Sequence, residues 1–202
     1  MIWSNSNHTF ERKMNMKTGT IILIVIVGIV VLLVLYGVSV YNSLVTLKNR
    51  VKNGWAQIEV QLKNRADLIP NLVETVKGYA SHEKEVFENV TKARSQVLNA
   101  KGVEETMQAD AAMNSAIGRL LVTVEAYPEL KANQNFISLQ AELKDAEEKI
   151  RYSRQFYNDT TMKYNTNIAL FPKNIFAGIF GFKEEPLFEA TEADRAVPKV
   201  QF

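Results

Sequence analysis

Residues 21–35 read IILIVIVGIVVLLVL, a run of 15 residues without a charge. Thr20 before it and residues 36–41 after it extend the uncharged stretch beyond 20 residues. A helix of that length spans about 30 Å, which is enough to cross the hydrocarbon core of a bilayer. The run therefore predicts a transmembrane helix over residues 18–40, with Tyr36 and Tyr41 as membrane-interface candidates.

Two other interpretations of the run are weaker. Residues 37–39 loosely match the small-x-small cleavage site of a signal peptide, but the apolar run is longer than the usual apolar region of such peptides and helical patterning continues past it. A core helix of such uniform apolarity would need a much larger protein around it. We therefore expect a retained, single-pass anchor in a cell membrane.

The charges on either side of the run leave the orientation open. Three basic residues precede the run and three follow it: Arg12, Lys13, Lys17, and Lys48, Arg50, Lys52. Because positive charge favours the cytoplasmic side, this tie does not place the rest of the chain on either side of the membrane. Translation from Met14 or Met16 would favour a cytoplasmic bundle, so it also stays open whether residues 1–13 of the N-terminal tail (1–17) belong to the native protein.

Composition excludes several classes of function. The chain has 24 basic and 22 acidic residues, so it lacks the strong positive field that nucleic-acid binding requires. It has no cysteine and two distant histidines, His8 and His82, and it contains no P-loop, GxSxG or HExxH motif. We expect no enzyme activity, no cofactor or metal, and no small-molecule or nucleic-acid partner.

Residues after the run repeat an apolar pattern every eleven residues. Three such repeats give Leu44, Leu47, Val51; Trp55, Ile58, Leu62; and Ala66, Ile69, Val73. A repeat of 3.67 residues per turn predicts a nearly straight helix with one apolar stripe, continuing from the membrane segment to about Lys77. Trp55 is predicted to be a core residue.

Pro70 interrupts this stripe. Proline cannot donate to the carbonyl four residues earlier, so we expect a kink that frees the carbonyl of Ala66. Asn71 is a candidate to bond the freed backbone groups.

Three further helices are predicted. The first has Ser81 as its N-cap and an apolar stripe at Val86, Val90, Ala93 and Val97. The second follows a break at Gly102, ends near Pro128, and carries Val103, Met107, Ile117, Leu121 and Val124. The third, residues 132–170, has a heptad of the coiled-coil kind at Phe136, Leu139, Leu143, Ala146, Ile150, Ser153, Tyr157, Thr160 and Tyr164.

Helix lengths and short connections then predict the topology. Neighbouring helices joined by short loops run antiparallel. We expect an all-α fold in which the transmembrane helix continues into an elongated antiparallel four-helix bundle, residues 41–170, with two long and two short helices.

Residues 171–182, FPKNIFAGIFGF, are aromatic and carry one charge. They are interpreted as a plug at the base of the bundle, as an anchor in the membrane interface, or as a partner-binding patch. Phe171, Phe176 and Phe180 are the membrane-interface candidates. The tail, residues 183–202, is predicted to be extended or disordered, with Val200 and Phe202 as docking residues.

Two long stretches, residues 41–95 and 127–182, closely resemble the LemA family in the family's order. Residues at the family's recurrent positions include Trp55, residues 67–73, Gly78, Tyr79, Arg94, Tyr157, Asn158, Tyr164, Asn165, Phe171 and Pro172. The resemblance implies a membrane-tethered helical bundle without assigned catalysis and without active-site residues to carry over. Some relatives are linked to magnetosome membranes, and others are encoded beside a membrane metalloprotease.

Two functions are compatible with these features. One is a non-enzymatic scaffold at the bacterial cell membrane that associates with further copies of itself. The alternative is a regulatory or accessory subunit of a membrane enzyme or protease. The expected partners are the lipid bilayer, further copies of the chain and another membrane protein.

Overall fold

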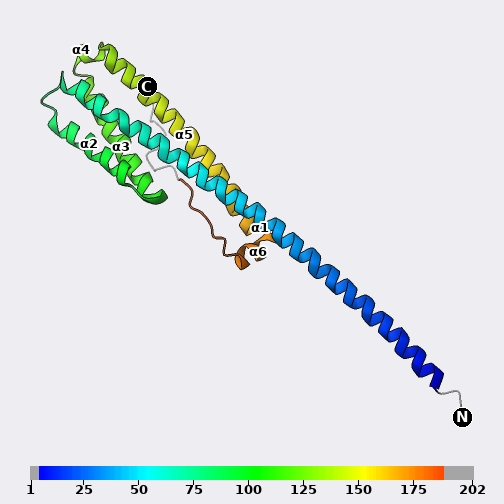
Figure 1. The fold of residues 1–202 in the computed structure, drawn as a ribbon. Helices are drawn as coiled ribbons and strands as arrows, with labels where there is room; N and C mark the ends of the chain where they lie inside the picture. Colours follow the sequence, from blue (N-terminus) through cyan, green and yellow to red (C-terminus); the bar gives the residue numbers. More distant parts are fainter. Residues whose placement is uncertain (1–4, 189–202) are drawn as a thin grey trace, which may run out of the picture. The chain divides into compact units, whose positions relative to one another are not determined.

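The computed structural model describes residues 5–188, with side-chain surroundings from residue 19 onward. Within that part every regular element is a helix, and no strand is present (Figure 1). The helices are α1 (Asn5–Lys77), α2 (Lys84–Asn99), α3 (Gly102–Val124), α4 (Pro128–Lys131), α5 (Gln134–Ala169) and α6 (Lys173–Ile179). The prediction of an all-α fold is confirmed. Val200 and Phe202 lie outside the described residues.

Two helix starts differ from those expected. Ser81 is not an N-cap, because residues 78–83 form a turn in which the N–H of Glu83 donates to Ala80 and that of Lys84 to His82. The helix α2 begins only at Lys84. The break at Gly102 is real: this glycine has a φ of 73° and is the first residue of α3. A positive φ of that size favours glycine, which has no Cβ to clash.

The chain divides into two compact units. One unit comprises the chain up to Thr46 together with Asn167–Lys183, and the other comprises Leu47–Thr166 together with the chain from Glu184. The long helix α1 contributes to both. We describe each unit by itself.

The larger unit has one hydrophobic core, to which α1 to α5 all contribute. Eight of the nine positions of the eleven-residue repeat on α1 are buried, and Trp55 is half-buried. On α5 the heptad positions are buried except for Ser153, which is half-buried. In this unit α2 and α3 form a hairpin of neighbouring helices (Figure 1). Apolar periodicity therefore identified the inner faces of both long helices.

The inner face of α3 was predicted wrongly. Of the five residues expected to form its stripe, Val124 is buried and the other four are half-buried. The buried residues are Thr106, Ala109, Asp110, Met113, Ala116, Leu120 and Val124. The predicted face is displaced because the true face contains a charged residue, Asp110, which hydropathy assigns to solvent.

Candidate functional site

The apolar run of α1 is not covered by any described part of the chain. Every residue from Gly19 to Tyr36 is exposed, and the large apolar side chains of residues 21–35 are between 50% and 67% exposed. Burial begins at Gly37 and Val40. The helix from Gly19 holds one segment that is long and apolar enough to cross a membrane.

The predicted interface aromatics of the smaller unit divide into two groups. The Phe176 ring lies 5.6 Å from that of Tyr36, and the Phe180 ring lies 5.0 Å from that of Tyr41, both in edge-on geometry. Edge-to-face contacts of this kind stabilise aromatic pairs. Phe171 takes no part in these pairs and is 79% exposed. The segment 171–182 thus folds back on α1 and still presents an apolar outer side.

Trp55, predicted to be a core residue, stands at the edge of the core of the larger unit. Its ring lies 5.7 Å from that of Tyr157 on α5, and its indole N–H donates to Glu59 over 2.7 Å. The neighbouring Gly54 makes the approach of the two helices possible, because a Cβ there would lie 3.2 Å from the Cα of Tyr157.

Pro70 lies inside α1 without ending the helix. The carbonyl oxygen of Ala66 instead accepts a hydrogen bond of 2.9 Å from Nε of Arg94 on α2. The group that meets this carbonyl is therefore Arg94 and not Asn71, whose side chain is exposed.

A group of charged residues lies where the sequence pattern expected an apolar core. We call it the buried ion-pair cluster; its members are Arg65 on α1, Asp110 and Asn114 on α3, and Glu147 and Arg154 on α5. Arg65 is 2% exposed. It donates through one terminal nitrogen to Asp110, and through the other to Asn114 over 2.6 Å and to Glu147 over 2.5 Å. Arg154 donates to the second oxygen of Asp110.

The charges of this cluster balance, and its centre, Arg65 and Asp110, is buried. Two guanidinium groups face two carboxylates, so the charges cancel. Burial lowers the pKa of Arg65, while the adjacent Glu147 carboxylate acts to raise it. An arginine stays charged in proteins, so it neither gives nor takes a proton near neutral pH. The cluster links three helices, and no histidine or cysteine stands in it to act as a base or nucleophile.

Residues 184–188, which we call the strap, lie along α5 in extended form. Two asparagines, seven residues apart, each exchange two hydrogen bonds with the backbone of the strap. Asn165 does so with Glu185, at 2.8 and 3.0 Å, and Asn158 with Phe188, at 2.9 and 2.8 Å. The Tyr157 hydroxyl donates to the carbonyl of Pro186 over 2.6 Å.

Phe188 fastens the end of the strap. Its ring is buried, lies 6.4 Å from that of Trp55, and has the guanidinium of Arg154 4.8 Å above it. Sequence reasoning described this part of the tail only as extended or disordered. A signal that could have indicated the contact is the recurrence of a Tyr-Asn pair at residues 157–158 and 164–165.

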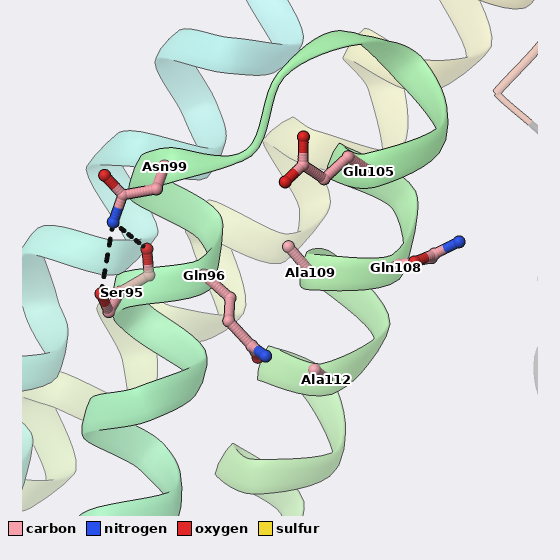
Figure 2. A pocket seen from close by; sticks show the side chains of 7 residues that line it. All are labelled: Ser95, Gln96, Asn99, Glu105, Gln108, Ala109 and Ala112. Carbon is pink, nitrogen blue, oxygen red and sulfur yellow. Dashed lines mark hydrogen bonds between the residues drawn. The ribbon is translucent and has the colours of Figure 1, made fainter.

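The larger unit has hollows of polar and of apolar character. Figure 2 shows a depression of about 380 Å³ between α2 and α3, where the Asn99 amide turns back to Ser95 and Glu105 is the one charged side chain. A groove of about 490 Å³ lies beside the buried ion-pair cluster, floored by Ile117, Leu121 and Leu143. Among the described residues no group of three or more His, Cys, Asp or Glu residues is placed to hold a metal ion.

Comparison with known proteins gives one family. The sequence profile of the LemA family matches residues 54–202. A magnetosome protein MamQ of Paramagnetospirillum magneticum is 27% identical over 179 aligned positions, and MamQ of Magnetospirillum gryphiswaldense is 26% identical over 179. Each comparison covers 76% of this chain and 66% of the relative, so the chain spans a little less than two thirds of these proteins. Protein LemA of Metamycoplasma hominis is 26% identical over 156 positions, covering 76% of this chain and 71% of that protein.

Proposed function

The chain belongs to the LemA family, and from this premise we propose that it is a single-pass protein of the bacterial cell membrane that serves as a non-enzymatic scaffold. One observation carries the proposal. The side chains of residues 21–35 form an apolar surface that no described part of the chain covers. In water such a surface is strongly unfavourable, and in a bilayer it is the surface that lipid tails match.

The larger unit supports a structural role. The buried charged residues of this unit form ion pairs between helices, and the strap is hydrogen-bonded to α5. These contacts hold helices together. The relatives that carry the name magnetosome protein are compatible with a role at a membrane.

Membrane flotation tests the anchor. Full-length protein is expressed, membranes are floated on a sucrose gradient, and the floating fraction is then extracted with alkaline carbonate. The wild type is expected to float and to resist extraction. Replacing both Ile26 and Val30 by Arg places two charges at the centre of the span, each opposed by roughly 2.5–3.5 kcal/mol, and should release the protein. The control is Val122→Arg on α3, an exposed apolar site outside the span. A wild type that stays soluble would refute the anchor.

The scaffold role includes association with further copies. Several large apolar side chains of the larger unit are exposed: Val60, Val122, Tyr152, Phe156 and Met162. Three of them, Tyr152, Phe156 and Met162, lie on α5, and a second copy of the chain is the partner that we propose for these three. Chemical cross-linking in membranes, followed by mass measurement in detergent, is expected to show a dimer or a larger assembly. The double variant Tyr152→Glu, Met162→Glu should lower the mass, whereas Lys92→Glu, at an exposed site on α2, should not. A wild type that is monomeric in both measurements contradicts self-association and leaves the accessory-subunit alternative.

A further inference from the structure

We propose that α6 lies in the headgroup region of the membrane, with Phe171, Ile175 and Ile179 entering the lipid. This inference rests on the proposed anchor and adds a second, non-spanning contact with the same bilayer. All residues concerned belong to the smaller unit.

The inner side of α6 is already occupied by packing on α1. The Phe176 ring contacts Tyr36, and Ala177 is buried. A Cβ at Gly37 would lie 2.8 Å from Cε1 of Phe176, so the ring occupies the space that a side chain there would need. Phe180 and Phe182 continue the contact at Tyr41, with ring centroids 5.0 and 5.8 Å away.

The outer side of α6 is apolar and uncovered within the described residues. Phe171, Ile175 and Ile179 follow one another at four-residue spacing and are 79%, 52% and 70% exposed. Residues four apart share one face of a helix, so Ile175 and Ile179 form a stripe on α6. Phe171 lies in the turn before α6 and is also exposed. The one charge on the segment, the ammonium of Lys173, donates to Asn167 over 2.5 Å. A charge held in this way leaves the stripe uninterrupted.

The position along α1 at which α6 packs identifies lipid as the surface that covers the outer side of α6. Residues 18–47 carry no charge, and these 30 residues span about 45 Å, the thickness of a bilayer with its headgroups. The exposed run, 19–36, accounts for about 27 Å, close to the hydrocarbon thickness. The ring contacts of α6 and of the residues just after it begin at Tyr36 and end at Tyr41, over about 7 Å of helix. This is the interval between hydrocarbon and water, where aromatic side chains concentrate.

Because the chain has no cysteine, single-cysteine variants can carry a spin label at chosen sites. Full-length protein is reconstituted in vesicles of phosphatidylcholine and phosphatidylglycerol, and the accessibility of each label to oxygen and to a water-soluble nickel complex is measured. Labels go to Phe171, Ile175 and Ile179, with Val30 as the reference within the span and Val122 as the aqueous reference. At Phe171, Ile175 and Ile179 we expect the ratio of oxygen accessibility to nickel accessibility to be several-fold above that at Val122 and below that at Val30.

Three outcomes are separable. Ratios at the α6 sites equal to that at Val122 would overturn the inference while a lipid-like Val30 leaves the anchor intact. Low accessibility to both reagents would place a second protein surface on α6 and would also overturn it. An aqueous signal at Val30 would refute the anchor itself.

A pair of glycine variants tests whether α1 holds α6 in place. Gly37→Leu invades the position of the Phe176 ring, whereas Gly28→Leu meets nothing within 4 Å. Gly37→Leu is therefore expected to change the ratio measured at Ile179, and Gly28→Leu to leave it unchanged. Equal effects of the two variants would show that the Phe176 contact does not position α6.

Discussion

Arg94 on α2 donates a hydrogen bond from its Nε to the carbonyl oxygen of Ala66 on α1. In an uninterrupted helix that oxygen would accept from the N–H of residue 70, but Pro70 has none. A neighbouring helix thus supplies the donor that the proline removes. This explains how α1 continues through Pro70 to Lys77.

This relationship predicts that Arg94 and Pro70 are energetically coupled. Arg94→Ala should lower the free energy of unfolding by about 1–3 kcal/mol, because it strands a buried acceptor. The same substitution in a Pro70→Ala background should lower it much less, because residue 70 then donates to Ala66. The wild type, Arg94→Ala, Pro70→Ala and the double variant are unfolded chemically in detergent, and unfolding is followed by circular dichroism. The four free energies of unfolding give the coupling energy.

The ion pair between Arg94 and Asp67, at 3.7 Å, is the competing explanation for any loss. It is partly exposed, so Asp67→Asn should change stability by less than about 1 kcal/mol. Equal losses in the two proline backgrounds would show that Arg94 acts without reference to the proline.

The buried ion-pair cluster predicts unequal effects of its two carboxylates. Asp110 accepts from both arginines and is 4% exposed, whereas the side chain of Glu147 is 46% exposed. Asp110→Asn leaves two guanidinium groups without their buried counter-charge and should destabilise the protein by about 3–5 kcal/mol. Glu147→Gln should lower stability by only about 1 kcal/mol or less, since water can replace it. Comparable losses for both variants, measured by chemical unfolding, would contradict this assignment of the central partner.

The strap predicts local protection from hydrogen exchange. Asn158→Ala removes two hydrogen bonds to Phe188, each contributing about 1 kcal/mol, so exchange at that amide should accelerate by about 30-fold. Asn158→Asp should also accelerate it, because a carboxylate accepts from the Phe188 N–H but cannot donate to its carbonyl. The exposed Asn64 is the control site for substitution by Ala. Unchanged exchange across residues 184–188 in both Asn158 variants would mean that other contacts hold the strap.

Tyr157 predicts a stability change at alkaline pH. Its pKa is raised, mainly by burial and further by the negative charge of Glu185. The neutral phenol is therefore favoured in the folded state, and the unfolded chain loses this proton first, near pH 10. The stability that the neutral Tyr157 phenol contributes is complete below that pH. It is lost as the pH rises through the higher pKa that Tyr157 has in the folded state. The difference in free energy of unfolding between wild type and Tyr157→Phe should be constant up to about pH 10 and should then shift against the wild type. If the free energies of the two proteins fell in parallel above that pH, this prediction would be contradicted.

Apolar spacing determined how much of this structure could be predicted. The membrane segment and the buried faces of α1 and α5 follow from positions such as Leu44, Ile58 and Ile150, where burial depends on the side chain's own hydropathy. Asp110 shows where that reasoning fails. Its burial depends on Arg65 and Arg154, each more than 40 residues away in sequence. The apolar pattern of α3 does not indicate these partners.

The strap and the start of α2 were missed for a related reason. Asn158 and Asn165 bind backbone groups, which every residue carries, so the strap itself shows no complementary side-chain pattern. Ser81 has the right chemistry for a cap, but the turn bonds of residues 78–83 delay the helix to Lys84.

The pairing of Arg65 and Arg154 around one aspartate also bears on how the helices find their alignment. A helix with a repeat of seven or eleven residues presents nearly the same apolar face after a shift by one repeat. Apolar contacts alone therefore leave several axial registers of one helix against another close in energy. A lone carboxylate between two guanidinium groups has one satisfactory partner arrangement, and each wrong offset would strand charge in the interior. We expect variants without Asp110 to sample slipped arrangements of α5 against α1, a loss of uniqueness beyond the loss of stability.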